Sequence, residues 1–317
     1  MNIGLDMMGG DFSPVEAVKG IQLYLKDANN PAALWLVGDE NQVRPLLKEY
    51  SIPEGSVPGS VQLVHAAQVI EMNEHPTRAL KEKQQSSIAV GFGLLAAGKM
   101  DAFISAGNTG AMLVGALYTL KPIEGIQRPT ISTVIPKENG KTGVLLDVGL
   151  NSDCKAENLN QFAILGSLYA QHILGIDKPR VGLLNIGEEE GKGNILAQAT
   201  YPLLKESSHI NFIGNIEGRD ILLDKADVMV CDGFTGNIIL KLAESLYDIS
   251  SRHKIESEYF DRFDFEYYGG TPLLGVTKPV IIGHGISRSK SFLNMVKLAQ
   301  KMIETDLLGK MKEHFLS

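Results

Sequence analysis

The chain alternates short apolar runs with longer segments in which apolar residues recur at helical spacing. Runs such as "NIGLDM", "DAFISAG" and "DVMVCDG" are continuously apolar, which is typical of parallel strands buried on both faces. Apolar residues recur at i, i+3 and i+4 over residues 14–29, 79–98, 108–120, 157–174, 196–206, 237–252 and 289–315. This alternation predicts an α/β fold, a doubly wound sandwich built around a mostly parallel sheet.

No composition shift or linker divides the 317 residues, so the sequence predicts one α/β domain over residues 1–317. Hydrophobic residues make up 44% of the chain, which is enough for a large core. The stretch "ISTVIPKENGKTGVLLDVG" predicts a hairpin that turns at Asn139 and Gly140.

The charge and cysteine content exclude several classes of protein. A formal net charge of -7 does not favour binding to nucleic acid, and an anionic ligand would have to be held by local donors and cations. Cys154 and Cys231 form no CxxC pair, and the seven histidines show no metal-ligand spacing. We therefore expect no metal and a cytoplasmic protein, because the N-terminus resembles no signal peptide and no apolar run is long enough to span a bilayer.

Seven strand ends share one pattern, in which an apolar run is followed by glycine mixed with polar residues. They are "LDMMGGD", "ISAGNTG", "LLDVGLN", "LLNIGEEEGKGN", "FIGNIEGRD", "VCDGFTGN" and "IIGHGIS". In parallel sheets, ligands bind outside the carboxyl ends of the strands, where glycine lets backbone N–H groups approach them. A single such loop is more often a helix cap, but seven at one sheet edge predict an anion site suited to phosphate.

Motifs for common cofactors are absent from these loops. "AGNTGAMLVG" only approximates G-x-G-x-x-G, and there is neither a P-loop nor a G-x-S-x-G elbow. Cys231 lies within an apolar strand, where it is better explained as a small core residue than as a nucleophile. No cofactor is expected.

Several blocks together resemble the signature of the PlsX family, the acyl-acyl-carrier-protein:phosphate acyltransferases of bacterial phospholipid synthesis. The blocks include "DMMGGD", "SAGNTGA", "VGLLNIGEEEGKGN", "GNIEGRD", "DVMVCDGFTGNIILK" and "YGGTPLLGV" followed by "GHG", in order from Met1 to about Met302. The resemblance implies a fold like the phosphotransacetylases and the isocitrate dehydrogenase-like group. It also implies a homodimer that passes a long-chain acyl group from an acyl carrier protein thioester to inorganic phosphate.

This reaction agrees with the residues, because phosphate is already ionised and a thiolate leaves readily, so no protein nucleophile is required. Catalysis can rest on holding phosphate against the thioester carbonyl and stabilising the oxyanion. Two alternatives stay open: a phosphotransacetylase-type enzyme that uses short-chain acyl-CoA, and a non-catalytic scaffold for lipid-synthesis enzymes.

The resemblance assigns candidate site residues to five of the loops. Lys192, Asn237, Asn185 and His284 are expected to be catalytic, with Lys192 as the cation that Asn185 and Glu188 position. The expected phosphate or substrate contacts are Asp11, Gly107, Asn108, Thr109, Glu188, Asp232, Gly233, Thr235, Gly236 and Ser287.

Four of these residues also have simpler structural explanations. Lys192 could be a solvated loop lysine, His284 a structural histidine, Asp11 a cap of the helix that begins near Pro14, and Asp232 a residue that holds its turn.

The chain departs from the family pattern in three places, one of which is "KEKQQSS", where Lys81 and Lys83 remain but the acid of the usual block does not. Phe12 stands where the family motif has histidine, so no role of that imidazole carries over. The segment of about 242–267 is shorter than expected and is predicted to form a helical excursion at a dimer or membrane surface. Its aromatic residues alternate with acids rather than with cations, which does not favour peripheral membrane contact.

Overall fold

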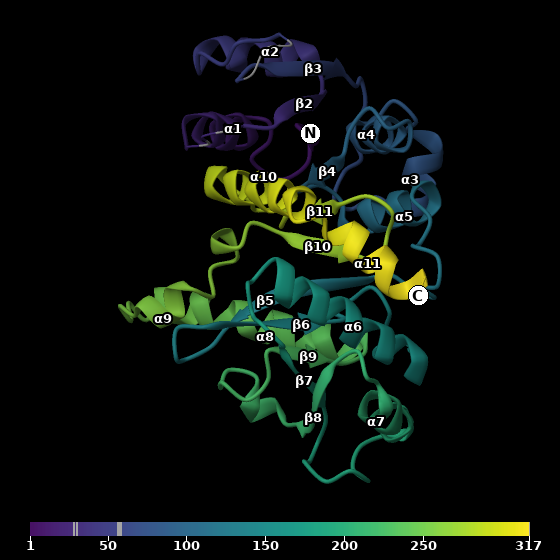
Figure 1. Cartoon of the computed structure of the whole chain (residues 1–317). Helices are drawn as coiled ribbons and strands as arrows, with labels where there is room; N and C mark the ends of the chain where they lie inside the picture. The colour runs from purple at the N-terminus through teal and green to yellow at the C-terminus, as the bar shows by residue number, and fades with distance from the viewer. Residues whose placement is uncertain (28, 30, 56–58, 317) are drawn as a thin grey trace. The chain divides into compact units, whose positions relative to one another are not determined.

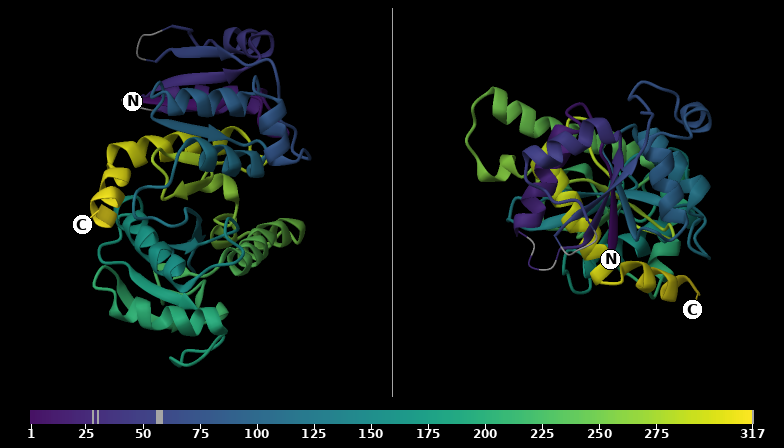
Figure 2. Two further views of the ribbon diagram at one scale, coloured as in Figure 1. Left: turned by 90° about the vertical axis from the view of Figure 1, so that its right-hand side faces the viewer. Right: turned by 90° about the horizontal axis from the view of Figure 1, so that it is seen from above.

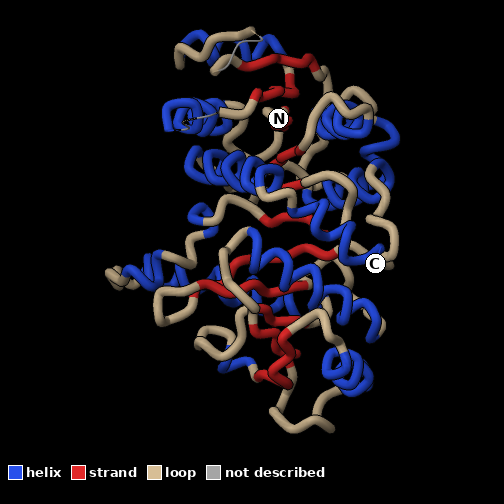
Figure 3. The backbone as a smooth tube through the Cα atoms, viewed as in Figure 1, coloured by secondary structure: helices blue, strands red, loops and turns tan. Residues whose placement is uncertain are grey.

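The computed structural model describes residues 1–27, 29, 31–55 and 59–316. The chain forms two compact units, each with its own sheet and helices on both faces (Figures 1 and 3). Unit 1 comprises Met1–Pro122 and Phe265–Glu304, and unit 2 comprises Ile123–Asp264 and Thr305–Ser317. The expectation that residues 1–317 act as one acyltransferase domain stays a prediction.

The sheet of unit 1 has the order β3-β2-β1-β4-β11-β10, in which only β10 is antiparallel. Its strands are β1 (Asn2–Asp6), β2 (Ala33–Gly38), β3 (Val61–His65), β4 (Ala102–Ser105), β10 (Thr271–Leu274) and β11 (Val280–Ile282). The helices on one face are α1 (Val15–Asp27), α2 (Glu40–Glu49) and α10 (Ser289–Glu304), and those on the other are α3 (Pro76–Glu82), α4 (Ser87–Ala96) and α5 (Thr109–Thr119) (Figure 2). The strand order reverses at β1, because β2 and β3 are added on one side of it and β4 on the other. Doubly wound folds bind ligands at a reversal of this kind.

The sheet of unit 2 has the order β5-β6-β9-β7-β8, in which only β5 is antiparallel. Its strands are β5 (Thr130–Pro136), β6 (Thr142–Leu146), β7 (Arg180–Leu184), β8 (Asn211–Ile216) and β9 (Val228–Val230). Its helices are α6 (Ala156–His172), α7 (Ile195–Glu206), α8 (Gly233–Arg252), α9 (Glu258–Asp261) and α11 (Leu307–Leu316). Because Leu146 and Leu183 both pair with Val230, the strands β6, β9 and β7 end level with one another.

Most of the expected elements are confirmed, including the parallel strands and the hairpin of β5 and β6. The expectation of one helix over 289–315 was wrong, because Asp306 has a φ of 49° and separates α10 from α11. The helix expected over 79–98 is two helices, since the Ser86 hydroxyl caps a new start at α4. The helix expected over 14–29 ends at Asp27, and Ala28 lies outside the described residues.

The segment that follows α8 does not present its phenylalanines to solvent. Phe263 is buried and packs edge-on against Tyr259, while Phe260 and Phe265 are half-buried. The expectation that this segment lies at a dimer or membrane surface stays a prediction. Among the described residues, no helix is long and apolar enough to cross a bilayer.

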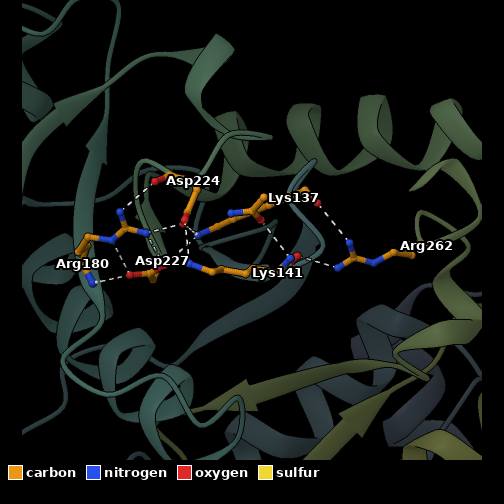
Figure 4. Close-up of polar contacts among 7 residues, drawn as sticks. Lys137, Lys141, Arg180, Asp224, Asp227 and Arg262 are labelled. Carbon is orange, nitrogen blue, oxygen red and sulfur yellow. Dashed lines mark hydrogen bonds and ion pairs between the residues drawn. The ribbon is translucent and has the colours of Figure 1, made fainter. Parts of the chain in front are cut away.

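A buried lysine ties the β5–β6 hairpin to the amino ends of the parallel strands of unit 2 (Figure 4). Lys137 is 0% exposed, and its Nζ atom lies 2.8 Å from Asp227 and 3.2 Å from Asp224. Arg180 pairs with the same two carboxylates, at 2.9 Å from Asp227 and 2.5 Å from Asp224. Burial opposes ionisation of Asp227, but hydrogen bonds from Arg180 and Lys137 outweigh it and hold its pKa well below the usual range.

A cavity of about 660 Å³, lined in part by Arg180 and Asp227, borders this cluster. This cavity lies at the amino ends of the strands, whereas the glycine-rich loops follow their carboxyl ends.

Replacing Lys137 by alanine should lower the free energy of unfolding by about 3–5 kcal/mol, because the buried Asp227 carboxylate and the partly exposed Asp224 carboxylate lose a buried cation. The control is Lys141→Ala, which removes an ammonium group that is 66% exposed and pairs with Asp224 at 2.9 Å. That change should cost less than about 1 kcal/mol. Urea denaturation of both variants measures the difference, and equal losses would contradict the account of the buried lysine.

Candidate functional site

The stretch "DGFTGN" forms the N-terminal end of α8 rather than a loop before it. The helix begins at Gly233, four residues earlier than the sequence predicts, because the Asp232 side chain caps it. One Asp232 oxygen accepts the N–H of Thr235 at 2.9 Å, and the other accepts the Thr235 hydroxyl at 2.9 Å. Asp232 and Thr235 therefore hold the turn.

The two glycines of this stretch allow α8 to approach the loop that follows β6. A Cβ on Gly236 would lie 1.8 Å from the carbonyl oxygen of Asp147, and one on Gly233 would lie 2.7 Å from that of Asn151. The Gly233 N–H donates to the Asn151 carbonyl at 2.7 Å. Two N–H groups of the first turn, those of Gly233 and Thr235, are thus engaged within the protein.

Asn237 lies one position beyond this close approach and is exposed. Its Nδ2 atom donates to the Val148 carbonyl at 3.2 Å, which fixes the orientation of the amide. One amide hydrogen and the Oδ1 atom can then serve a ligand. Among the residues expected at this turn, Asn237 is exposed, and its catalytic role stays a prediction.

The loop after β6 is organised by Asp147, a residue that the sequence analysis did not single out. Its buried carboxylate accepts the backbone N–H groups of Ile131, Gly149, Leu150 and Asn151. The Asn151 side chain donates to the same carboxylate at 2.7 Å and to the Pro129 carbonyl at 2.8 Å. The sequence did carry one signal for Asp147: in "LLDVG" it follows a buried strand and precedes a glycine-containing turn.

Lys192 lies on the loop that follows β7, and β7 neighbours β9, the strand that precedes α8. The Asn185 side chain donates to the Lys192 carbonyl at 3.1 Å and accepts the N–H of Ile186, so it shapes the loop. The Lys192 side chain is 51% exposed, and its nearest carboxylate is Glu189, at 4.0 Å.

Glu188 does not position Lys192 as expected. Its carboxylate lies 2.5 Å from Lys225, which also bonds to Asp220 at 2.8 Å. The hydrogen bonds that Lys225 donates to Asp220 and Glu188 raise its pKa and keep it charged. Three carboxylates lie close enough to share a metal ion: those of Glu188, Glu217 and Asp220. Each of them already pairs with a cation, either Lys225 or Arg219.

In unit 1, three loops meet at the carboxyl ends of β1, β4 and β11. The buried Asp6 carboxylate accepts the Ser105 hydroxyl at 2.6 Å and the Met8 N–H at 2.9 Å. Ser105 in turn accepts the Gly107 N–H at 2.9 Å. Burial raises the pKa of Asp6, and these donors oppose that shift.

Asp11 and the residues after β4 help to join these loops. The backbone N–H of Asp11 donates to the Gly285 carbonyl at 2.7 Å, while its side chain is exposed. The Asn108 side chain caps α5 and donates to the carbonyls of residues 71, 72 and 74, so its amide is structural. Thr109 is exposed at the first position of α5.

Ser287 and His284 lie together after β11. Ser287 is 2% exposed, and its hydroxyl oxygen has no hydrogen-bond partner among the described residues. Such an orphaned buried hydroxyl favours a substrate contact. His284 accepts the Ile286 N–H at its Nδ1 atom, and its ring lies 4.8 Å from that of Phe265.

Comparison with known proteins defines the family. Residues 1–255 match the family described as fatty acid synthesis protein. Phosphate acyltransferases of Dictyoglomus turgidum and Aquifex aeolicus are 44% and 43% identical, across 99% and 98% of this chain and 97% and 96% of those proteins. The chain belongs to the phosphate acyltransferase family. The resemblance to PlsX enzymes is confirmed, and the protein is an acyltransferase.

Solved phosphotransacetylase structures share the fold of this acyltransferase. The enzyme from Streptococcus pyogenes superposes with a TM-score of 0.64 at 19% identity, covering 96% of this chain and 94% of that one. A branched-chain phosphotransacylase from Enterococcus faecalis gives 0.62 at 15% identity, covering 96% and 99%. The expected phosphotransacetylase-like α/β fold is confirmed.

Replacing Gly236 by alanine should destabilise the acyltransferase by at least about 2 kcal/mol, because the new methyl group would overlap the Asp147 carbonyl. Gly218→Ala is the matched control, since a Cβ there meets no atom within 4 Å. Thermal unfolding measures both. A Gly236→Ala protein as stable as the control would show that α8 does not pack this closely.

Proposed function

We propose that this acyltransferase transfers a long-chain fatty acyl group from the thioester of an acyl carrier protein to inorganic phosphate. The product is an acyl phosphate that feeds phospholipid synthesis. Within the family assignment, the observation that carries this proposal is that Asn237 and Lys192 are exposed in the segments that follow the neighbouring strands β9 and β7. An amide donor and a cation carried at the same end of the sheet suit a transferring anion.

Direct attack by phosphate agrees with the state of the two cysteines. Burial raises the pKa of Cys231 well above its ordinary value, and burial raises that of Cys154 to about 11. Both thiols stay protonated at neutral pH and are poor nucleophiles. A phosphate oxygen therefore forms the bond to the thioester carbonyl carbon, and the carrier thiolate leaves as the tetrahedral intermediate collapses.

In this proposal Lys192 neutralises the charge that develops on phosphate and on the carbonyl oxygen, and Asn237 orients them by donating an N–H group. The phosphate contacts expected of Ser287 and His284, which belong to unit 1, stay a separate prediction. Because acyl phosphates hydrolyse readily, the site must also exclude water while the product forms. We propose a cytoplasmic location, which the two free cysteines fit.

Lys192→Ala and Asn237→Ala should each lower kcat/KM for acyl phosphate formation by about 10–100-fold, since each removes a donor to the transition state. Lys205→Ala is the control, because this α7 lysine pairs with Glu190 at 2.9 Å. Hydroxamate trapping with palmitoyl-carrier protein, with and without phosphate, measures the product. Folded variants with normal turnover would show that the site is misplaced.

The same assay with acetyl-CoA tests the alternative. A short-chain donor that outperforms the carrier-bound palmitoyl group would favour a phosphotransacetylase-type activity instead.

We also propose that two copies associate through the exposed face of α8. Four large apolar side chains, spaced by four, four and seven residues, project from this face at 41–65% exposure: Phe234, Ile238, Leu242 and Ile249. Water-exposed apolar residues in such a row are typical of a helix that packs against another helix.

Leu242→Asp should convert the dimer to a monomer, because a charge would be buried at the centre of this face. The control is Lys241→Asp, which changes a neighbouring side chain that pairs with Glu244. Analytical ultracentrifugation of both variants measures the assembly. A dimer that persists in Leu242→Asp would place the interface elsewhere.

A further inference from the structure

The Asp147 carboxylate collects an unusual number of hydrogen bonds for one side chain. Its Oδ1 atom accepts three backbone N–H groups at 3.2–3.3 Å, and its Oδ2 atom accepts the Asn151 N–H at 2.6 Å and the Asn151 side chain at 2.7 Å. Because every partner is a donor, both oxygens act as acceptors. Asp147 is fully buried, and the loop of residues 147–151 is wrapped around its carboxyl group. Burial raises the pKa of Asp147, and the hydrogen bonds that it accepts oppose that shift.

This loop makes the contacts that orient Asn237. The Val148 carbonyl accepts the Asn237 amide at 3.2 Å, and the Asn151 carbonyl accepts the N–H of Gly233 at the start of the same helix. Gly149 lies so close that a Cβ on it would be 3.0 Å from Asn237 Nδ2. By drawing the loop's N–H groups inward, Asp147 leaves the carbonyls of Val148 and Asn151 directed at α8.

We infer that Asp147 is a positioning residue for acyl transfer, which acts by holding the 147–151 loop so that its carbonyls fix the Asn237 amide. This inference rests on the proposed function, because it requires Asn237 to contact the reacting groups. Asp147 itself is buried beneath the loop and touches no substrate. A misplacement of a donor by a fraction of an ångström is enough to lower turnover.

A purely structural role would predict something different. It would lower stability, and it would reduce turnover by the same factor whether or not Asn237 is present. A positioning role predicts that the effect on kcat disappears once the Asn237 amide has been removed, since residues that act as one unit are not additive.

The test is a double-mutant cycle with Asp147→Asn, which keeps the shape but turns an NH₂ group toward backbone donors. We expect Asp147→Asn and Asn237→Ala each to lower kcat by about 10–100-fold, and the double variant to lie within about threefold of Asn237→Ala alone. The KM for the acyl donor should change less than about threefold. Lys192→Ala serves as the contrast, because Lys192 lies on another loop and its effect should multiply with that of Asp147→Asn.

Gly149→Ala disturbs the same contact between the 147–151 loop and Asn237, and it replaces Asp147→Asn if that variant does not fold. It leaves the carboxylate in place but inserts a methyl group against the Asn237 amide, and the φ of +135° adds strain. Its kcat should fall in the wild-type background and stay unchanged in the Asn237→Ala background. Gly218→Ala should have no effect in either background.

The outcomes separate this inference from the proposed function. Full multiplication of the Asp147→Asn or Gly149→Ala effect with that of Asn237→Ala would overturn the positioning role while leaving the site in place. Normal turnover of the folded Asn237→Ala variant would overturn both.

Discussion

A buried aspartate at the end of a strand is the interaction on which the glycine-rich loops of each unit depend. Asp6 ends β1 and holds "DMMGG" against the loop after β4, and Asp147 follows β6 and holds "DVGLN" beneath α8. Glycine-rich loops have few side chains with which to pack, so their conformations must be fixed through backbone groups. A side chain whose two oxygens accept several hydrogen bonds fixes such a loop at a single point.

The glycines and the polar residues of these loops serve different purposes. Gly233 and Gly236 allow α8 to touch the β6 loop, and Asp232 satisfies the helix N-terminus. These groups build the site but leave few backbone donors for substrate. We propose that the chemistry falls instead on exposed side chains carried by this frame, above all Asn237 and Lys192. In this proposal, most residues of "DGFTGN" hold the start of α8 in place, and Asn237 supplies the side-chain amide that contacts substrate.

The sequence was sufficient for the α/β fold and for the strand ends, because continuous apolar runs and glycine-rich turns are local signals. It was not sufficient for the packing between loops. The close contact of Gly236 with Asp147 joins residues that are distant in the chain, and nothing in "LLDVG" alone shows how many N–H groups its aspartate accepts. The pairing of Glu188 with Lys225, rather than a role beside Lys192, likewise depends on tertiary structure.

The most direct measurement is a crystal structure of the enzyme with bound phosphate, determined for the wild type and for Asn237→Ala. Our account predicts phosphate within hydrogen-bonding distance of the Asn237 amide and the Lys192 ammonium group, and a displaced or weaker ion in the variant. Phosphate bound away from the end of β9, or unchanged in Asn237→Ala, would contradict it.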